Sequence, residues 1–286
     1  MTETVTRTEM IVPEPAEGLA GLLDIDLPPG GRLPPLWHWI YLLDRRKQHD
    51  LGPDGHPAHG IPAPPGPGRL RMFAGGRVTT HALLRFGEYA TRTTRVLHTT
   101  EKLGKSGPLT FVTVRSEIEQ DGRLAIADEQ DIVYRQPGTA LPPPALAIPG
   151  TTAVPSTTSV APVPSTDSVP PGAAGLALHV DPVLLFRFSA LTYNAHRIHY
   201  DAAYAAQEGY PGLVVHGPLQ ALMMGELFRR AGELFTGREF TYRLVAPMFG
   251  TQTFTVTSTE GISTLALSAQ VRDAIGHVTA TSGLLP

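Results

Sequence analysis

The pattern of apolar and polar positions divides the chain into two parts with a similar layout. In the first part, the apolar segment 36–43 predicts a helix, and strand-like runs follow at 71–81, 89–102, 109–120 and 124–135. Asp121-Gly122, between the last two runs, indicates a hairpin turn. The first part is therefore predicted to be a helix followed by an antiparallel run of strands.

The second part repeats this order. Residues 177–191 read as a strand, and a short helix follows that begins near Asp201 as N-cap and ends at Gly209. A longer helix is predicted over 218–235, because apolar residues recur every three or four positions and form one buried face. Strands are predicted at 239–245, 251–258, 264–272 and 277–282. Together the two parts predict an α+β fold, with curved antiparallel sheet wrapped on a central helix.

The segment between the two parts has a different composition. Pro, Ser, Thr and Ala dominate residues 136–174, and proline removes backbone donors and disfavours helix. We predict an extended linker there. The expected organisation is an N-terminal repeat over 1–135, the linker over 136–174 and a C-terminal repeat over 175–286.

Composition narrows the class of protein. The chain has 286 residues, of which 42% are hydrophobic, and a formal net charge of −3, so it can bury a core. No basic stripe points to nucleic acid or to an anionic membrane. The absence of cysteine excludes disulfides, cysteine nucleophiles and thiolate metal sites. No apolar stretch has the length of a signal peptide core or a membrane span, so we expect a cytoplasmic protein.

Residues 193–201, Tyr-Asn-Ala-His-Arg-Ile-His-Tyr-Asp, concentrate polar chemistry between a predicted strand and a short helix. His199 can exchange a proton near neutral pH. Asn194 can orient a water or a carbonyl but cannot act as a base. Asp201 suits a helix cap. The same cluster could instead be a structural turn or, with less support because no fourth ligand is evident, a metal site.

A second candidate element is 212–219, which leads into the long predicted helix. Gly217 lacks a Cβ and Pro218 suits the first helical position, so free N–H groups at this helix start could hold a developing oxyanion. Three apolar residues before it are expected to line an acyl pocket: Leu213, Val214 and Val215. His216 is more often a structural hydrogen-bonding residue than a catalyst in such a position.

At these residues the second part resembles the MaoC-like hot-dog hydratases and dehydratases. That superfamily carries Asp-x-Asn-Pro-x-His-x-Asp, then an apolar loop ending in His-Gly at the hot-dog helix. Here Asn194 stands at the catalytic Asp position and His196-Arg197 at the Asn-Pro position. This pattern resembles a subgroup, the type 2 hydroxyacyl-thioester dehydratases and mesaconyl-C4-CoA (3-methylfumaryl-CoA) hydratases. Segments 37–39, 51–57, 71–77, 104–109 and 128–134 resemble its N-terminal half.

The resemblance implies a double hot-dog with a degenerate first repeat and a catalytic second repeat. It implies a hydro-lyase that adds water to, or removes it from, a short branched or dicarboxylic enoyl-CoA such as mesaconyl-C4-CoA. Alternatives are a 3-hydroxyacyl-thioester dehydratase of fatty-acid or polyketide assembly, a thioesterase, and a drifted acyl-thioester-binding protein. The expected carrier is CoA or the pantetheine of an acyl carrier protein, and neither a separate cofactor nor a metal is expected. A homodimer is expected.

The implied catalytic residues are His199 as acid and base, Asn194 as the residue that orients water, and Gly217 as the oxyanion donor. The implied substrate-binding residues, which include a phosphate-holding turn at 105–107, are Leu213, Val214, Val215, His216, His196, Lys105, Ser106, Gly107 and Arg243. Further cationic candidates for the CoA phosphates are Lys102, Arg71 and Arg77.

Overall fold

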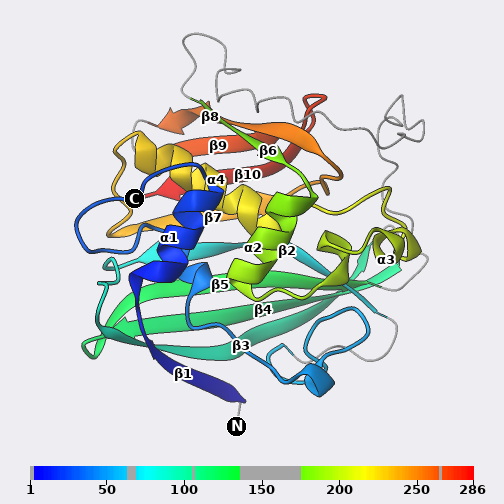
Figure 1. The fold of residues 1–286 in the computed structure, drawn as a ribbon, viewed down its shortest axis with the longest axis horizontal. Helices are drawn as coiled ribbons and strands as arrows, with labels where there is room; N and C mark the ends of the chain where they lie inside the picture. The colour runs from blue at the N-terminus through cyan, green and yellow to red at the C-terminus, as the bar shows by residue number, and fades with distance from the viewer. Residues whose placement is uncertain (1–2, 63–68, 105–106, 136–174, 264–265) are drawn as a thin grey trace.

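The computed structural model describes residues 3–62, 69–104, 107–135, 175–263 and 266–286. The predicted linker over 136–174 lies outside these described residues, and the division of the chain into two repeats with that linker stays a prediction. Ten strands form one antiparallel sheet (Figure 1). They are β1 (Thr4–Met10), β2 (Leu70–Thr80), β3 (Tyr89–Gly104), β4 (Gly107–Gln120), β5 (Arg123–Arg135), β6 (Gly175–Val180), β7 (Arg238–Leu244), β8 (Gln252–Ser263), β9 (Ala266–Arg272) and β10 (Val278–Leu285).

The order of the strands shows an internal repeat. It runs β1-β3-β4-β5-β2 and then β7-β10-β9-β8-β6, so the second half repeats the first in reverse spatial order. The halves meet where β2 pairs with β7, from Gly75 opposite Arg243 to Thr80 opposite Arg238. The two wrapped sheets expected from the sequence are therefore continuous across this central pair.

Two glycines allow the halves to meet this closely. A Cβ on Gly75 would lie 2.4 Å from the Tyr242 carbonyl oxygen, and one on Gly76 would lie 2.1 Å from the Glu129 carbonyl oxygen. Gly75 also has φ +154°, in a region that other residues rarely adopt. Backbone thus approaches backbone on both sides of β2, and larger residues there would push the strands apart.

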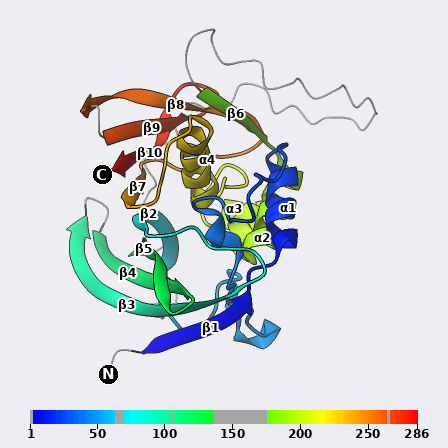
Figure 2. The same cartoon turned by 90° about the vertical axis from the view of Figure 1, so that its left-hand side faces the viewer.

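The helices are unequal in the two halves. The longest, α4 (Gly217–Arg230), packs against β7, β8, β9 and β10, and the sheet curves around it (Figure 2). Between β1 and β2 the first half has α1 (Pro13–Leu22) and two 3₁₀ turns, η1 (Trp37–Ile40) and η2 (Gln48–Asp50). α1 lies beside α2 (Pro182–Thr192), and η3 (Arg197–His199) and α3 (Ala202–Gln207) follow α2.

Most predicted strands are confirmed, and the hairpin at Asp121-Gly122 is confirmed by positive φ at both residues. The strand predicted over 177–191 is wrong beyond Val180, because 182–192 form α2. Asp181 caps this helix by accepting a hydrogen bond from the Leu184 N–H (2.7 Å), and Pro182 occupies its first position. A continuous apolar run concealed these two start signals.

Two other expectations need correction. The helix predicted over 36–43 is only the short turn η1, and the helix predicted to reach residue 235 ends at Arg230, before Gly232 with φ +85°. Leu234, which was expected on the buried face, is consequently exposed. Residues 4–22 carried no prediction, yet they form edge strand β1 and helix α1.

One buried polar contact joins the halves beneath the sheet. Trp37, fully buried in η1, donates its indole N–H to Glu226 Oε1 on α4 at 3.0 Å. Glu226 also accepts hydrogen bonds from Arg229 and Arg230. Burial alone would raise the pKa of Glu226, but Arg229, Trp37 and Arg230 lower it below its usual value. The carboxylate is thus kept charged inside the core by its donors.

The Trp37–Glu226 contact predicts a stability effect. Trp37→Phe keeps most of the apolar surface but removes one donor from a buried carboxylate, so we expect the free energy of unfolding to fall by about 1–3 kcal/mol. Urea unfolding followed by circular dichroism measures this. In a Glu226→Leu background, which has no acceptor, the loss from Trp37→Phe should shrink; an unchanged loss would show that the hydrogen bond contributes nothing.

Candidate active site

A cavity of about 960 Å³ lies between the two halves and is lined by both. The first half contributes strands β2 to β5 and the loop that carries Gly55, His56 and Pro57. The second half contributes Asn194, His196, His199, Val214 and the start of α4. This volume is at the upper end of the range for ligand pockets, so the cavity has room for a large ligand.

The segment 193–201 follows a helix rather than the strand predicted from the sequence. α2 ends at Tyr193 in the left-handed conformation (φ 50°), which turns the chain toward the cavity. Asn194 Oδ1 then accepts the His196 N–H at 3.0 Å, so its amide N–H groups remain as donors. Asp201 caps α3 by accepting the Tyr204 N–H and pairs with Arg197, so the prediction that it is a helix cap is confirmed.

His199 is buried and held in one orientation. Its Nδ1 lies 2.7 Å from the Val214 carbonyl oxygen, and its ring stacks on His216 with ring centres 3.7 Å apart. Because a carbonyl oxygen only accepts hydrogen bonds, Nδ1 carries the proton and Nε2 keeps a free lone pair. His199 lines the cavity, so this lone pair is the group that it offers to a ligand.

Burial keeps His199 neutral. It lowers the pKa of His199 to about 3, against the effect of the Val214 carbonyl, and the nearby His196 and His56 lower it further. His216, fully buried behind it and bonded to Ser189 Oγ (2.9 Å), has its pKa lowered by burial first and then by His199 and His196. At neutral pH the site therefore contains an uncharged base, His199, stacked on a second uncharged histidine, His216.

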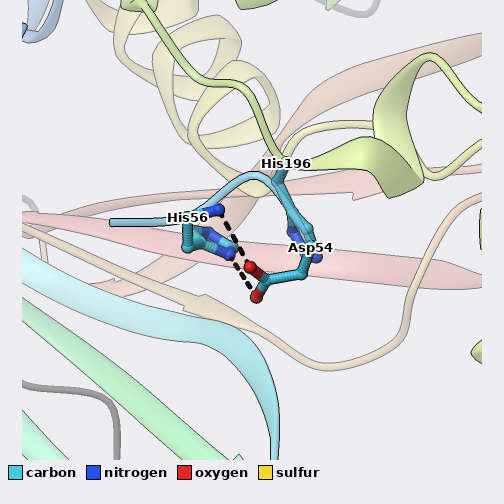
Figure 3. Close-up of side chains that lie close together, drawn as sticks. All are labelled: Asp54, His56 and His196. Carbon is cyan, nitrogen blue, oxygen red and sulfur yellow. Dashed lines mark hydrogen bonds and ion pairs between the residues drawn. The ribbon is translucent and has the colours of Figure 1, made fainter. Parts of the chain in front are cut away.

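The first half adds an Asp–His pair that sequence reasoning did not select. Asp54 accepts the His56 N–H at 3.0 Å and contacts His56 Nδ1 at 3.1 Å (Figure 3). The His56 ring lies 4.1 Å from that of His196, which is 5.6 Å from that of His199. Burial lowers the pKa of His56 to about 3, while its bonds to Asp54 oppose this. Burial alone would raise the pKa of Asp54, but His56 lowers it to about 2.

A close contact fixes this loop against the second half. Gly55 has φ +88°, and a Cβ there would lie 1.8 Å from the Ala195 carbonyl oxygen. The Arg197 N–H donates to the Asp54 carbonyl at 2.9 Å, and the Arg197 side chain reaches the Pro53 carbonyl at 3.1 Å. The Asp-Gly-His sequence was the available signal for this contact, since Gly between two polar residues marks a tight loop.

Asp54, His56 and His196 each offer a ligand atom within 4.8 Å of the others, a spacing compatible with a metal ion. However, both Asp54 oxygens already bond to His56. The metal site considered from the sequence would instead use His196, His199 and Asp201. Asp201 already bonds to the Tyr204 N–H and to Arg197. That the protein works without metal or cofactor stays a prediction.

The start of α4 faces the cavity as predicted. Gly217 is its first residue and lines the cavity together with Pro218 and Gln220. Pro218 has no N–H, and the first N–H groups of a helix have no partner within it, so the Gly217 N–H is the donor nearest this end. A Cβ on Gly217 would lie 2.1 Å from Leu244 Cδ1, so a larger residue there would displace the Leu244 side chain.

The structure separates the predicted substrate-binding residues into three groups. His196, Val214 and Val215 line the cavity, whereas Leu213 and His216 do not. Arg243 is exposed and also outside that set, so any contact with substrate would be to a part that projects from the cavity. Lys105 and Ser106 lie outside the described residues, and of Gly107 only its place at the start of β4 is described.

The model of the hydroxyacyl-thioester dehydratase type 2 family matches residues 36–250. The chain belongs to this family. This chain is similar to a mesaconyl-C(4)-CoA hydratase of Chloroflexus aurantiacus. The two are 42% identical over 277 residues, which cover 93% of this chain and 90% of the relative. Both are hydro-lyases of acyl thioesters, and this dehydratase-family chain is likewise an enzyme of that class.

Solved structures confirm the fold of this dehydratase-family chain. HtdX of Mycobacterium tuberculosis superposes with a TM-score of 0.67 at 15% identity, covering 100% of this chain and 99% of that one. A second protein of that organism, described as a double hot-dog fold, covers 99% of this chain and 94% of its own, with a TM-score of 0.53 and 15% identity. The predicted double hot-dog is thus confirmed.

In the described ranges, no helix combines the length and apolarity needed to cross a membrane.

The buried neutral histidines predict a dependence of stability on pH. Unfolding returns His56, His199 and His216 to a pKa near 6.5, so below that pH the unfolded chain binds more protons and the fold loses stability. We expect the free energy of unfolding to fall by as much as about 4 kcal/mol per pH unit between about pH 6 and pH 4.

Denaturant unfolding at a series of pH values measures this slope. His199→Gln removes one of the three groups and should reduce the slope by about a third. Equal slopes in the two proteins would mean that His199 titrates in the folded state at an ordinary pKa.

Proposed function

We propose that the protein hydrates an α,β-unsaturated CoA thioester whose acyl group is short and carries a second, free carboxylate, as in mesaconyl-C4-CoA. The observation that carries this proposal is the neutral His199, with its free Nε2 in a cavity built from both halves. The similarity to a mesaconyl-C(4)-CoA hydratase over nearly the whole chain supports the acyl class.

In this mechanism His199 performs both proton transfers. Nε2 takes a proton from water while the water oxygen attacks the β-carbon, and the electrons of the double bond move to the thioester oxygen. His199 then returns the proton to the α-carbon, so water adds to one face of the double bond. The reverse sequence removes water. Asn194 orients the attacking water with its amide N–H groups, since its oxygen is held by the His196 N–H.

The protonation states suit a single base. His199 begins and ends each cycle neutral, and its low pKa keeps it neutral in both directions of the reaction. The imidazolium formed within the cycle is stabilised through Nδ1–H by the Val214 carbonyl. An amide stands at position 194, where the superfamily has an aspartate. Because an amide cannot carry a proton, His199 performs both proton transfers.

The Gly217 N–H supplies the oxyanion contact. It stands at the positive end of α4 and borders the cavity, where it can donate to the thioester oxygen as negative charge develops. Donors of this kind typically contribute about 10²–10³-fold to the rate. Dehydration of a 3-hydroxyacyl thioester is the second candidate, favoured by the family match, and it uses the same residues in the reverse direction.

Substitution of the base tests the proposal directly. His199→Ala should lower kcat by at least about 10²–10⁴-fold, because general acid–base catalysis is lost, while the fold remains. Loss of enoyl-thioester absorbance with mesaconyl-C4-CoA measures hydration, and free thiol release measures hydrolysis. Near-normal turnover by this variant would contradict the role of His199, and thiol release by the unaltered enzyme would indicate a thioesterase.

Asn194→Asp tests whether position 194 is equivalent to the catalytic aspartate of the superfamily. An aspartate can still accept the His196 N–H and adds a second proton carrier, so we expect activity to be retained within about 10-fold, or raised. The pH profile of kcat/KM should gain an acidic limb from the new carboxyl group. An inactive but folded variant would show that the amide N–H groups are indispensable.

A further inference from the structure

Arg71, near the start of β2, is a cation in the cavity wall without a bonded partner. It lines the cavity and is partly buried, and its guanidinium makes no hydrogen bond or ion pair with another side chain in the described ranges. Burial lowers the pKa of its guanidinium, and only longer-range effects of Tyr134 and Asp54 oppose this. A guanidinium stays protonated in proteins, so the site holds a positive charge that is poorly solvated.

Arg71 lies at the catalytic end of the cavity. It pairs across the strands with Tyr134, and its charge acts on His56, whose low pKa is due first to burial and then in part to Arg71. His56 in turn contacts His196, whose ring lies 5.6 Å from that of His199. Arg71 and His199 line the same cavity.

Two of the other cavity-lining arginines have polar partners of their own. Arg46 pairs with Asp44 at 2.7 Å, and Arg135 bonds to the Tyr210 hydroxyl. A third, Arg92, has Asp44 and Asp128, which also line the cavity, as electrostatic neighbours. The acid nearest Arg71 is Asp54, which lies outside the lining set and has both oxygens bonded to His56. Arg71 thus presents its charge to the ligand.

The surroundings of Arg71 fit an anion with a short apolar body. Phe73 on β2, Ile132 opposite it on β5, and Val114 on β4 line the same cavity. A guanidinium beside such a wall matches a carboxylate in two-point geometry, while the apolar residues contact the attached carbon atoms. A neutral acyl chain would bury the same guanidinium without compensation.

We propose that Arg71 binds the free carboxylate of the acyl group and thereby selects dicarboxylic over neutral enoyl thioesters. This rests on the proposed function. In a fumaryl- or mesaconyl-type C4 thioester the free carboxylate is attached to the β-carbon. A two-point contact there places the carbon that water attacks against His199, and it neutralises a charge that would otherwise oppose the electron-rich transition state.

The first test compares kcat/KM for fumaryl-CoA with that for crotonyl-CoA, in which a methyl group replaces the carboxylate. Arg71→Met should lower the fumaryl-CoA to crotonyl-CoA ratio on the order of 10²–10³-fold relative to the unaltered enzyme. Arg71→Lys keeps the charge but loses the planar guanidinium. Its fumaryl-CoA to crotonyl-CoA ratio should therefore lie between those of the unaltered enzyme and Arg71→Met. Arg69→Met removes the same charge two residues away, where Arg69 bonds to Thr110, and should leave the ratio unchanged.

The second test measures binding without turnover. Calorimetric titration with succinyl-CoA and butyryl-CoA should show that Arg71→Met selectively weakens succinyl-CoA. This arm separates the two proposals: selective loss of succinyl-CoA affinity supports the carboxylate contact even if no hydration is detected. An equal loss for both ligands would assign Arg71 to the CoA phosphates, and a selective loss in Arg92→Met but not in Arg71→Met would place the carboxylate elsewhere; either result overturns the inference.

Discussion

The pairing of β2 with β7 is the constraint on which the site depends. It joins the two halves into one sheet, and Gly75 permits it because a Cβ there would lie against the Tyr242 carbonyl oxygen of β7. The cavity lies beside this junction, with strands of the first half on one side and the start of α4 on the other. The base and the acyl wall therefore come from opposite halves of the chain, held at a fixed distance by backbone hydrogen bonds.

Electrostatics in the cavity follow from burial rather than from ion pairing. His199, His56 and His216 are all kept neutral by desolvation, although Asp54 is ionised beside His56. A cluster of charged imidazolium rings at these separations would repel itself, so mutual proximity reinforces the neutral state. This arrangement suits a reaction in which the same nitrogen first accepts and then returns a proton.

Much of this could be predicted from the sequence, and the failures have physical causes. Local signals identified most of the strands but not β1, and they identified the Asp121-Gly122 turn, the Asp201 cap and the long helix, predicted from Pro218, because each depends on neighbours in the chain. The start of α2 was missed because a run of apolar residues suits a buried helix as well as a strand.

His56 and Arg71 were not recognised as parts of the acid–base site, because their proximity to His196 depends on docking between distant segments. The sequence pointed to Arg71 only as one of several candidate cations for CoA phosphates. Motif resemblance supplied the residues of 194–217, and only the three-dimensional arrangement showed which arginines line the cavity beside His199.

The contact of Gly55 with the Ala195 carbonyl joins two separate segments of the sequence, which contribute different parts of the proposed site. The proposed catalytic residues lie in 194–217, while the cavity lining of the first half lies largely in 51–135, and the two segments touch through backbone atoms at this point. Substitutions in the wall can change which acyl group is accepted without moving the base. New substrate preferences can thus evolve in one half while the other conserves the reaction.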